Sequence, residues 1–234
     1  MDYQDIYQTL AAACVRGHAL RGPACELPPP LAEKPLEALS GRELTEILNF
    51  GKAWGVKLYR FKRGHETLPR VKQVLGFFKG VRPESLLDVG SGRGVFLFPF
   101  LEAFPDTEVT SLDLLDYRAA FLEDMHRGGI ERLHPIQADI RTHPLAESSV
   151  DAVTLLEVLE HIPDVQAAVT AAVHAARRYV VVSAPSKPDD NPEHIHLLTK
   201  PVLTELFHNA GCDDLHFAGV PGHLILVAAV SREE

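Results

Sequence analysis

Residues 86–97 constrain the fold more than any other part of the sequence, and they read Leu-Leu-Asp-Val-Gly-Ser-Gly-Arg-Gly-Val-Phe-Leu. A short apolar run ends in Gly-x-Gly-x-Gly, and an apolar segment suited to a helix follows at once. Glycine is needed where a Cβ would block a sharp turn or a ligand. The pattern therefore predicts a buried strand that turns directly into a helix. The first N–H groups of such a helix favour an anionic or electron-rich ligand.

A second strand supplies a candidate ribose contact. Asp113 ends the apolar run 109–113, nineteen residues after Gly94, and an acid at this place can bind both hydroxyls of a ribose. The dinucleotide fingerprint G-x-G-x-x-G spaces its glycines differently. Asp88, just before the glycines, repels phosphate groups but suits a cationic sulfonium and an α-amino group. These details favour a sulfonium-bearing nucleoside over a dinucleotide.

The same residues resemble motif I of the class I S-adenosylmethionine-dependent methyltransferases, in which Asp, an aliphatic residue and Gly-Cys/Ser-Gly-x-Gly follow one another. Asp113 lies where that family places its ribose-binding acid. The resemblance implies S-adenosyl-L-methionine as the cofactor, with the glycines along its methionine moiety and the later residues along its ribose and adenine. The implied cofactor-binding residues are Asp88, Gly90, Ser91, Gly92, Gly94, Asp113, Leu114, Asp139, Ile140 and Glu157.

From Pro83 onward the sequence alternates strand-like and helix-like segments. We expect strands at 85–90, 108–113, 133–138, 150–157 and 178–184, and helices at 94–104, 116–127 and 164–177. This alternation predicts a parallel sheet covered on both faces. A helix at 200–210 and strands at 213–219 and 223–230 follow, and the short link between these strands permits a hairpin but no parallel crossover. Residues 83–234 are thus expected to form an α/β domain, a Rossmann-like doubly wound sheet of mostly parallel strands with a C-terminal antiparallel hairpin.

Residues 1–82 are expected to form a helical N-terminal extension. Its first helix lies within 1–26, and the proline-rich segment 27–31 predicts a stiff linker that cannot be helix interior. Ser40 and Glu43 form a capping-box pattern that starts a helix reaching about residue 54. A further helix ends near Gly80. The resemblance implies that this region forms a lid over the substrate.

The chain is acidic overall, with a net charge of −9, but residues 51–82 carry nine Lys or Arg and a single acid. This basic segment predicts either a solvated face paired with acids of the same protein or a contact for an anionic substrate or RNA. No apolar run approaches the length of a membrane span, and the first residues lack the form of a secretion signal. The three cysteines show no disulfide or zinc pattern. A cytoplasmic protein is the expectation.

Two later segments carry candidate catalytic groups. Glu157-x-x-Glu160-His161 and His194-x-His196-x-x-Thr resemble the ubiquinone-biosynthesis type of O-methyltransferase. The resemblance implies transfer of a methyl group to a small-molecule acceptor, with oxygen as the receiving atom. His161 is the first candidate for the general base, because an imidazole titrates near neutral pH. His194 and His196 are the next candidates, and Glu160 is expected to orient the base.

Four alternatives stay open. Glu157, Glu160, His161 and His194 could together hold a divalent ion, Mg²⁺ or Mn²⁺ through the carboxylates or a softer metal through the imidazoles. The same four residues match the bacterial metal-dependent RNA 2′-O-methyltransferases, although His196 and the two leucines after it depart from that pattern. A structural alternative has Glu160 and His161 cap the helix near Asp164, while His194 and His196 order a loop. A non-catalytic module that binds S-adenosylmethionine is the fourth. The acceptor and the oligomeric state are not defined by the sequence.

Overall fold

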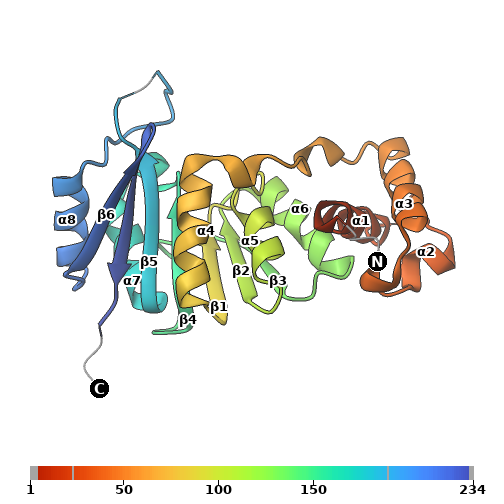
Figure 1. The fold of residues 1–234 in the computed structure, drawn as a ribbon, viewed down its shortest axis with the longest axis horizontal. Helices are drawn as coiled ribbons and strands as arrows, with labels where there is room; N and C mark the ends of the chain where they lie inside the picture. Colours follow the sequence, from red (N-terminus) through yellow and green to blue (C-terminus); the bar gives the residue numbers. More distant parts are fainter. Residues whose placement is uncertain (1–4, 23, 189, 232–234) are drawn as a thin grey trace.

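The computed structural model describes residues 5–22, 24–188 and 190–231, and its centre is one seven-stranded sheet (Figure 1). The strand order is β3-β2-β1-β4-β5-β7-β6. Strands β1 to β5 pair in parallel, whereas β7 runs antiparallel to both β5 and β6. The strands are β1 (Ser85–Val89), β2 (Glu108–Asp113), β3 (Leu133–Gln137), β4 (Val150–Leu156), β5 (Ala176–Pro185), β6 (Asp214–Val220) and β7 (His223–Ala229). The predicted fold class is confirmed.

Helices cover both faces of this sheet. One face packs against α4 (Pro69–Val81), α5 (Leu97–Ala103) and α6 (Asp116–Arg127). In this core the ring of Phe78 contacts those of Phe96, Phe100 and Phe104, and the ring of Phe98 contacts that of Phe121. The other face packs against α7 (Val165–Ala175) and α8 (Lys200–Asn209), mostly through Ala, Val and Leu. Among the described residues, no helix combines the length and the apolar character that crossing a membrane requires.

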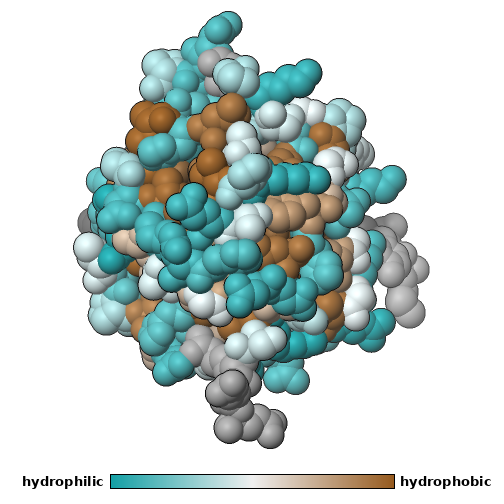
Figure 2. Space-filling model, turned by 90° about the vertical axis from the view of Figure 1, so that its left-hand side faces the viewer, coloured by the Kyte–Doolittle hydropathy of each residue, from teal (hydrophilic) through white to brown (hydrophobic). Residues whose placement is uncertain are grey.

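The β6–α8 side of the molecule is shown in space-filling form in Figure 2. Hydrophobic residues appear there as separate patches between hydrophilic ones. Large apolar side chains that are exposed in this part of the chain include Ile195, Leu197 and Val202. Strand β6 is an edge of the sheet, and its exposed residues include Asp214 and His216, which form an ion pair with each other. Charges on an edge strand discourage pairing with another chain.

The predicted strands and helices of residues 83–230 lie within three residues of the observed ones. The largest shift is at the glycine motif, where α5 begins at Leu97 instead of residue 94. Gly94 has a φ of +81° and its N–H donates to the Ser91 carbonyl, so the chain makes turns before the helix can begin.

The N-terminal region contains α1 (Ile6–Ala19) and α3 (Gly41–Ala53) in addition to α4, and the capping box of Ser40 and Glu43 is present. Residues 27–31, predicted to be a stiff linker, contain the start of a helix. A short helix α2 (Pro29–Glu33) starts there, because proline is tolerated at the first positions of a helix, whose N–H groups need no partner within it. Residues 1–4 and Pro23, which fall within the first predicted helix, lie outside the described part of the chain.

Helices α1 to α3 lie beyond α6 at the β3 end of the sheet, whereas α4 lies across β1 and the middle of the sheet (Figure 1). Apolar residues of α1, α3 and α4 belong to the same core as those of α5 and α6. The extension and the sheet are thus continuous in their packing. The lid function of this region stays a prediction.

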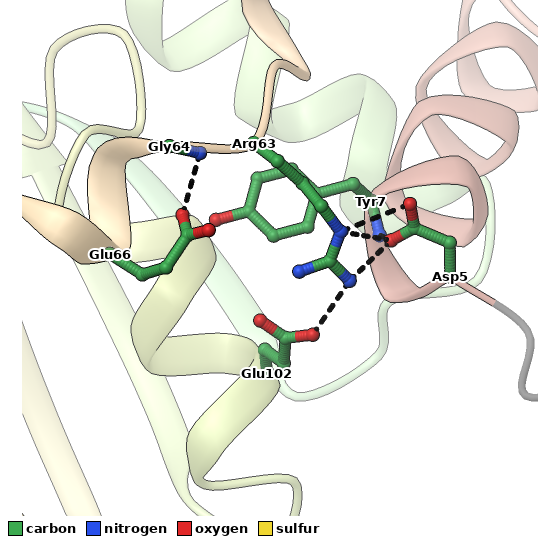
Figure 3. A network of polar contacts seen from close by, with 6 residues as sticks. All are labelled: Asp5, Tyr7, Arg63, Gly64, Glu66 and Glu102. Carbon is green, nitrogen blue, oxygen red and sulfur yellow. Dashed lines mark hydrogen bonds and ion pairs between the residues drawn. The ribbon is translucent and has the colours of Figure 1, made fainter.

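Part of the basic segment is paired with acids of the same chain. Arg63 forms ion pairs with Asp5, at the start of α1, and with Glu102 of α5, and its guanidinium lies 4.8 Å from the centre of the Tyr7 ring (Figure 3). Burial raises the pKa of Tyr7, and the carboxylates of Glu66 and Glu102 raise it further. For Arg63 this supports the expectation of pairing within the protein.

Glycine allows α1 and α6 to approach closely. A Cβ on Gly17 would lie 1.8 Å from the backbone oxygen of Asp124, which is too close for any rearrangement of a side chain to relieve. We expect Gly17→Ala to lower the free energy of unfolding by about 3 kcal/mol, because the two helices must separate. Urea unfolding checks this. Gly76→Ala in α4 is the control, since nothing lies within 4 Å of its Cβ, and it should raise stability by about 0.5 kcal/mol. Equal effects of both variants would contradict the close approach.

Candidate active site

A cavity of about 710 Å³ opens at the carboxyl ends of the parallel strands. Its wall consists of the glycine loop after β1, the ends of β2, β4 and β5, the segment after β3 and the first turn of α4. Ligands of doubly wound sheets bind at this edge. The volume lies within the range of small-molecule sites. Ten of the predicted site residues line the cavity: Asp88, Gly90, Ser91, Gly92, Asp113, Leu114, Asp139, Ile140, Glu157 and His161.

Asp88 anchors the glycine loop from below. Its buried carboxylate accepts hydrogen bonds from Ser91 Oγ at 2.6 Å and from Thr154 Oγ1 of β4 at 2.7 Å. Burial raises the pKa of Asp88 to about 6, although these two hydrogen bonds lower it, and the carboxylate of Asp113 adds a smaller increase. The acid expected to face a cationic cofactor is therefore held at the cavity floor with a titration near neutral pH.

Gly90 and Gly94 are required for different reasons. Gly90 has a φ of +67°, and a Cβ there would lie 2.7 Å from Val158 Cγ2, so glycine lets the loops after β1 and β4 meet. A Cβ on Gly94 would lie 2.4 Å from the ring of Phe98. Gly94 is absent from the cavity lining among the described residues. Its predicted cofactor contact therefore has no support from the cavity geometry, and packing explains the glycine.

Asp113 at the end of β2 is fixed by its neighbours. Its Oδ1 accepts the N–H of Leu115 at 3.0 Å, its Oδ2 accepts the N–H of Gly92 at 3.2 Å, and Arg118 Nη1 lies 3.7 Å from Oδ2. A carboxylate has about four lone-pair sites, so acceptor capacity remains for a diol. Leu114, beside it, is 60% exposed. An acid next to a bare apolar surface suits a ribose and its base.

Asp139 and Ile140 follow β3. The side chain of Ile140 is buried, and Asp139 Oδ1 and Oδ2 lie 3.0 and 3.1 Å from Arg141 Nε. Hydrogen bonds from Arg141 hold the pKa of Asp139 below its ordinary value. Both residues line the cavity, as does Arg141. The sequence interpretation included Asp139 but missed Arg141, which shares its carboxylate.

His161 lies in a short 3₁₀ helix, Leu159–His161, after β4. Its Nδ1 is 2.9 Å from the carbonyl oxygen of Glu193. A carbonyl only accepts, so Nδ1 carries the hydrogen and Nε2 of the neutral ring holds the lone pair. Both His161 and Glu193 line the cavity. His161 therefore lines the same cavity as the glycine loop, with Nε2 as the ring nitrogen that holds the lone pair, and its role as general base stays a prediction.

Glu160, His161 and His194 come together, with one ligand atom from each lying within 4.8 Å of the others. The imidazole rings of His161 and His194 are 4.8 Å apart. Of these residues, His161 lines the cavity. Among the described residues of the cavity wall there is no Glu160, His194 or His196. Glu157 is outside this group of three, so the structure brings together three of the four predicted metal ligands.

Glu157 contacts other residues instead. Its Oε1 accepts a hydrogen bond from Ser183 Oγ of β5 at 2.6 Å, and its Oε2 lies 3.2 Å from His223 Nε2 at the start of β7. Its φ of +58° is unusual for a residue other than glycine. Sequence reasoning missed His223, because only the pairing of β7 with β5 brings position 223 beside the end of β4.

His196 and its neighbours fasten the loop before α8. His196 Nε2 donates to the Ile162 carbonyl at 3.1 Å, and the Ile195 N–H donates to the Glu160 carbonyl at 2.9 Å. This agrees with the loop-ordering alternative for His196. The capping alternative for Glu160 and His161 was wrong, since Asp164 itself caps α7 by accepting the Ala167 N–H at 3.0 Å.

Several cavity residues were not among the predicted site residues. Arg70 and Val71 reach the cavity from the first turn of α4, Arg93 from the glycine loop, and Tyr117 with Arg118 from α6. Their positions depend on how α4 and α6 pack on the sheet. The basic segment 51–82 therefore supplies one cation, Arg70, to the cavity wall.

Comparison with known proteins agrees with this geometry. Residues 87–179 match a family described as methyltransferase domain. This segment of the chain is a methyltransferase domain, in agreement with the resemblance of the glycine motif to the class I S-adenosylmethionine-dependent methyltransferases. It is 32% identical over 141 residues to the ubiquinone biosynthesis O-methyltransferase of Vibrio cholerae, covering 57% of this chain and 56% of that protein. It is 30% identical over 110 residues to the malonyl-[acyl-carrier protein] O-methyltransferase of Methylococcus capsulatus, covering 44% of this chain and 40% of the relative.

The methyltransferase fold extends beyond the matched segment. The solved structure of an O-methyltransferase family protein from Burkholderia thailandensis superposes with a TM-score of 0.59 at 16% identity, over 93% of this chain and 68% of that one. The sequence matches, by contrast, span about half the length of the curated relatives. The recognised resemblance is thus confirmed for residues 87–179, and the solved structure shows that the fold is shared beyond them.

Proposed function

We propose that the chain transfers the methyl group of S-adenosylmethionine to an oxygen atom of a small-molecule acceptor, with His161 as the general base. The observation that carries the proposal is the presence of His161 in the same cavity as the glycine loop and Asp113. Its Nδ1–H is engaged by Glu193, which leaves Nε2 as the basic atom. The relatives named as O-methyltransferases support oxygen as the receiving atom.

The residues present fit the cofactor. Gly90 and Gly92, both at positive φ, open the loop beside a methionine moiety, and Asp113 keeps lone pairs for a ribose. Leu114 and Ile140 offer apolar surfaces for a base. Asp88 supplies negative charge below the loop. When bound, S-adenosylmethionine supplies an electrophilic methyl group on a cationic sulfur.

His161 would accept a proton at Nε2 from the acceptor hydroxyl as its oxygen becomes nucleophilic. The Nδ1–H bond to the Glu193 carbonyl fixes the tautomer before the reaction and stabilises the imidazolium after it. The apolar wall residues, among them Val71, Phe96 and Ile162, exclude water around the reacting atoms. Most of the acceleration would come from orienting two substrates in this cavity.

The group of Glu160, His161 and His194 also favours a second possibility, a divalent ion. One carboxylate and two imidazoles within 4.8 Å suit Mn²⁺ or Zn²⁺ more than Mg²⁺. The Nδ1–H bond of His161 to a backbone carbonyl is the arrangement that orients histidine ligands. An ion held there would act as a Lewis acid on an acceptor oxygen. His161 cannot be both a ligand through Nε2 and a free base, so the two roles are separable by experiment.

Titration calorimetry with S-adenosylhomocysteine tests the cofactor site. We expect micromolar binding that Asp113→Ala weakens by about 100-fold, because two hydrogen bonds from the ribose to a charged group are lost. Asp106→Ala, an exposed acid in the turn before β2, is the control and should bind normally. Normal binding by Asp113→Ala would contradict the ribose assignment.

Release of S-adenosylhomocysteine from S-adenosylmethionine tests methyl transfer. The acceptor panel is phenol, 1,2-dihydroxybenzene, 4-hydroxybenzoate and a short single-stranded RNA with a 3′-terminal diol. We expect turnover with a small hydroxylated acceptor, unaffected by a chelator. Loss of turnover in chelator with recovery in Mn²⁺ would assign the cluster to metal binding, and turnover with the RNA alone would overturn the small-molecule acceptor. Binding without any turnover would overturn the proposed reaction and leave a cofactor-binding module.

A further inference from the structure

His223 is the feature of the site that the proposed reaction does not use. It lies outside the cavity lining of the described residues, yet its Nε2 is 3.2 Å from the carboxylate of Glu157, which does line the cavity. Its Nδ1 is 3.2 Å from the carbonyl oxygen of Pro221. The two ring nitrogens thus face two oxygen acceptors.

Both contacts are with oxygen atoms that accept hydrogen bonds. The Pro221 carbonyl and the Glu157 carboxylate therefore each attract a ring nitrogen of His223 that carries a hydrogen. Ser183 Oγ donates to the other carboxylate oxygen at 2.6 Å. Glu157 Oε1 therefore has one hydrogen-bond donor and Oε2 has one ion-pair partner, and a carboxylate with about four lone-pair sites keeps further acceptor capacity.

The backbone of Glu157 shows that its position is imposed by its surroundings. A φ of +58° is costly for a side chain without the short polar groups of Asn or Asp. The Glu157 N–H donates to the Ser183 carbonyl at 2.9 Å, and the side chain is held at both oxygens. Contacts from two neighbouring strands thus hold the residue in a strained conformation that turns it into the cavity wall.

The location of Glu157 separates it from the cofactor-binding residues at the ends of β2 and β3. Asp113 and Asp139 lie on one side of β1 in the sheet, whereas Glu157, Ser183 and His223 lie at the ends of β4 and β5 and the start of β7 on the other side. With the cofactor along β1 to β3, the β4–β5 side is left for the acceptor. This reassigns Glu157 from the expected cofactor contact to the acceptor side.

We propose that His223 is a positioning residue that, together with Ser183, fixes Glu157 as the hydrogen-bond acceptor for a donor group of the methyl acceptor. The substrate class is a molecule that presents an O–H or N–H to Glu157 while its nucleophilic oxygen lies at His161. This proposal rests on the proposed function. His223 acts through Glu157 and touches neither substrate.

The test uses the full chain, S-adenosylmethionine and 1,2-dihydroxybenzene, which carries a second donor beside its nucleophilic oxygen. We expect His223→Ala to raise KM for 1,2-dihydroxybenzene about tenfold, with KM for S-adenosylmethionine and binding of S-adenosylhomocysteine unchanged. His223→Gln keeps an N–H near the position of Nε2 and should restore KM to within about twofold of the wild type. His216→Ala is the matched control, because it removes a histidine paired with an acid on the adjacent strand β6.

A second variant shows whether His223 acts through Glu157. Glycine adopts a φ of +58° without strain, so Glu157→Gly removes the carboxylate and keeps the backbone. Its KM should rise at least as much as in His223→Ala, and adding His223→Ala to it should have no further effect. Unchanged KM in His223→Ala, or additive effects in the double variant, would overturn the proposal alone. Wild-type chain without turnover on any panel member would overturn the proposed function, and this proposal with it.

Discussion

Replacement of His161 by alanine is expected to lower kcat by about 10²- to 10⁴-fold, the range over which a positioned general base accelerates a reaction. Nε2 is the basic atom of His161, since Nδ1–H donates to Glu193. Alanine removes this base but leaves the glycine loop and Asp113 intact. Binding of S-adenosylhomocysteine should therefore stay within about twofold of the wild type. Single-turnover methyl transfer with a saturating acceptor separates the chemical step from binding.

His196→Ala is the control for this variant. Sequence reasoning placed His196 beside His161 as a catalytic candidate, but its Nε2 donates to the Ile162 carbonyl and the residue is not part of the described cavity wall. Its removal should cost about 1 kcal/mol of stability through one lost hydrogen bond and change kcat by less than about threefold. Equal losses of kcat in both variants would show that the histidines act by ordering the loop, and the general-base role would fall.

The strand ends could be predicted because their signals are local. The apolar runs that end at Asp88 and Asp113 each span only a few consecutive residues, and the glycines after Asp88 mark the turn that follows the first run. In a parallel sheet the carboxyl ends of all strands share one edge. Residues near those ends, such as Asp113 and His161, could therefore be expected to share one cavity without any knowledge of the packing, and both line it.

Contacts between segments far apart in the sequence could not be predicted in this way. The pairing of Glu157 with His223 depends on the register of β7 against β5, where His223 faces Pro185. Arg70 reaches the cavity only because α4 packs on the sheet with its first turn at the strand ends. The exclusion of Glu157 from the Glu160–His161–His194 group has the same origin. Glu157 and Glu160 are three residues apart, a spacing that suggests that both bind the same ion. The left-handed backbone at Glu157, however, turns its side chain toward β5 and β7.

Asp88→Asn is expected to change the pH dependence of stability. The pKa of Asp88 in the folded chain is about 6, above the value of about 3.9 for an unperturbed aspartate. A raised pKa contributes stability that is fully present below the unfolded value and is lost as pH rises through the folded one. The wild type should therefore lose about 1.4 kcal/mol from this group between pH 5 and pH 8. Asparagine does not titrate, so the free energy of unfolding of the variant, relative to the wild type, should rise by that amount over this interval.

The same variant should discriminate between the charged cofactor and its neutral product. S-adenosylmethionine carries a sulfonium and S-adenosylhomocysteine a thioether, so a buried carboxylate at the cavity floor favours the former. At pH 8 we expect Asp88→Asn to weaken the binding of S-adenosylmethionine about tenfold more than the binding of S-adenosylhomocysteine. In the wild type this preference should fall as pH drops toward 5 and Asp88 takes up its proton, while in the variant it should stay constant. Equal weakening of both ligands would mean that Asp88 serves only to hold Ser91 and Thr154, and that the loop, not the charge, recognises the cofactor.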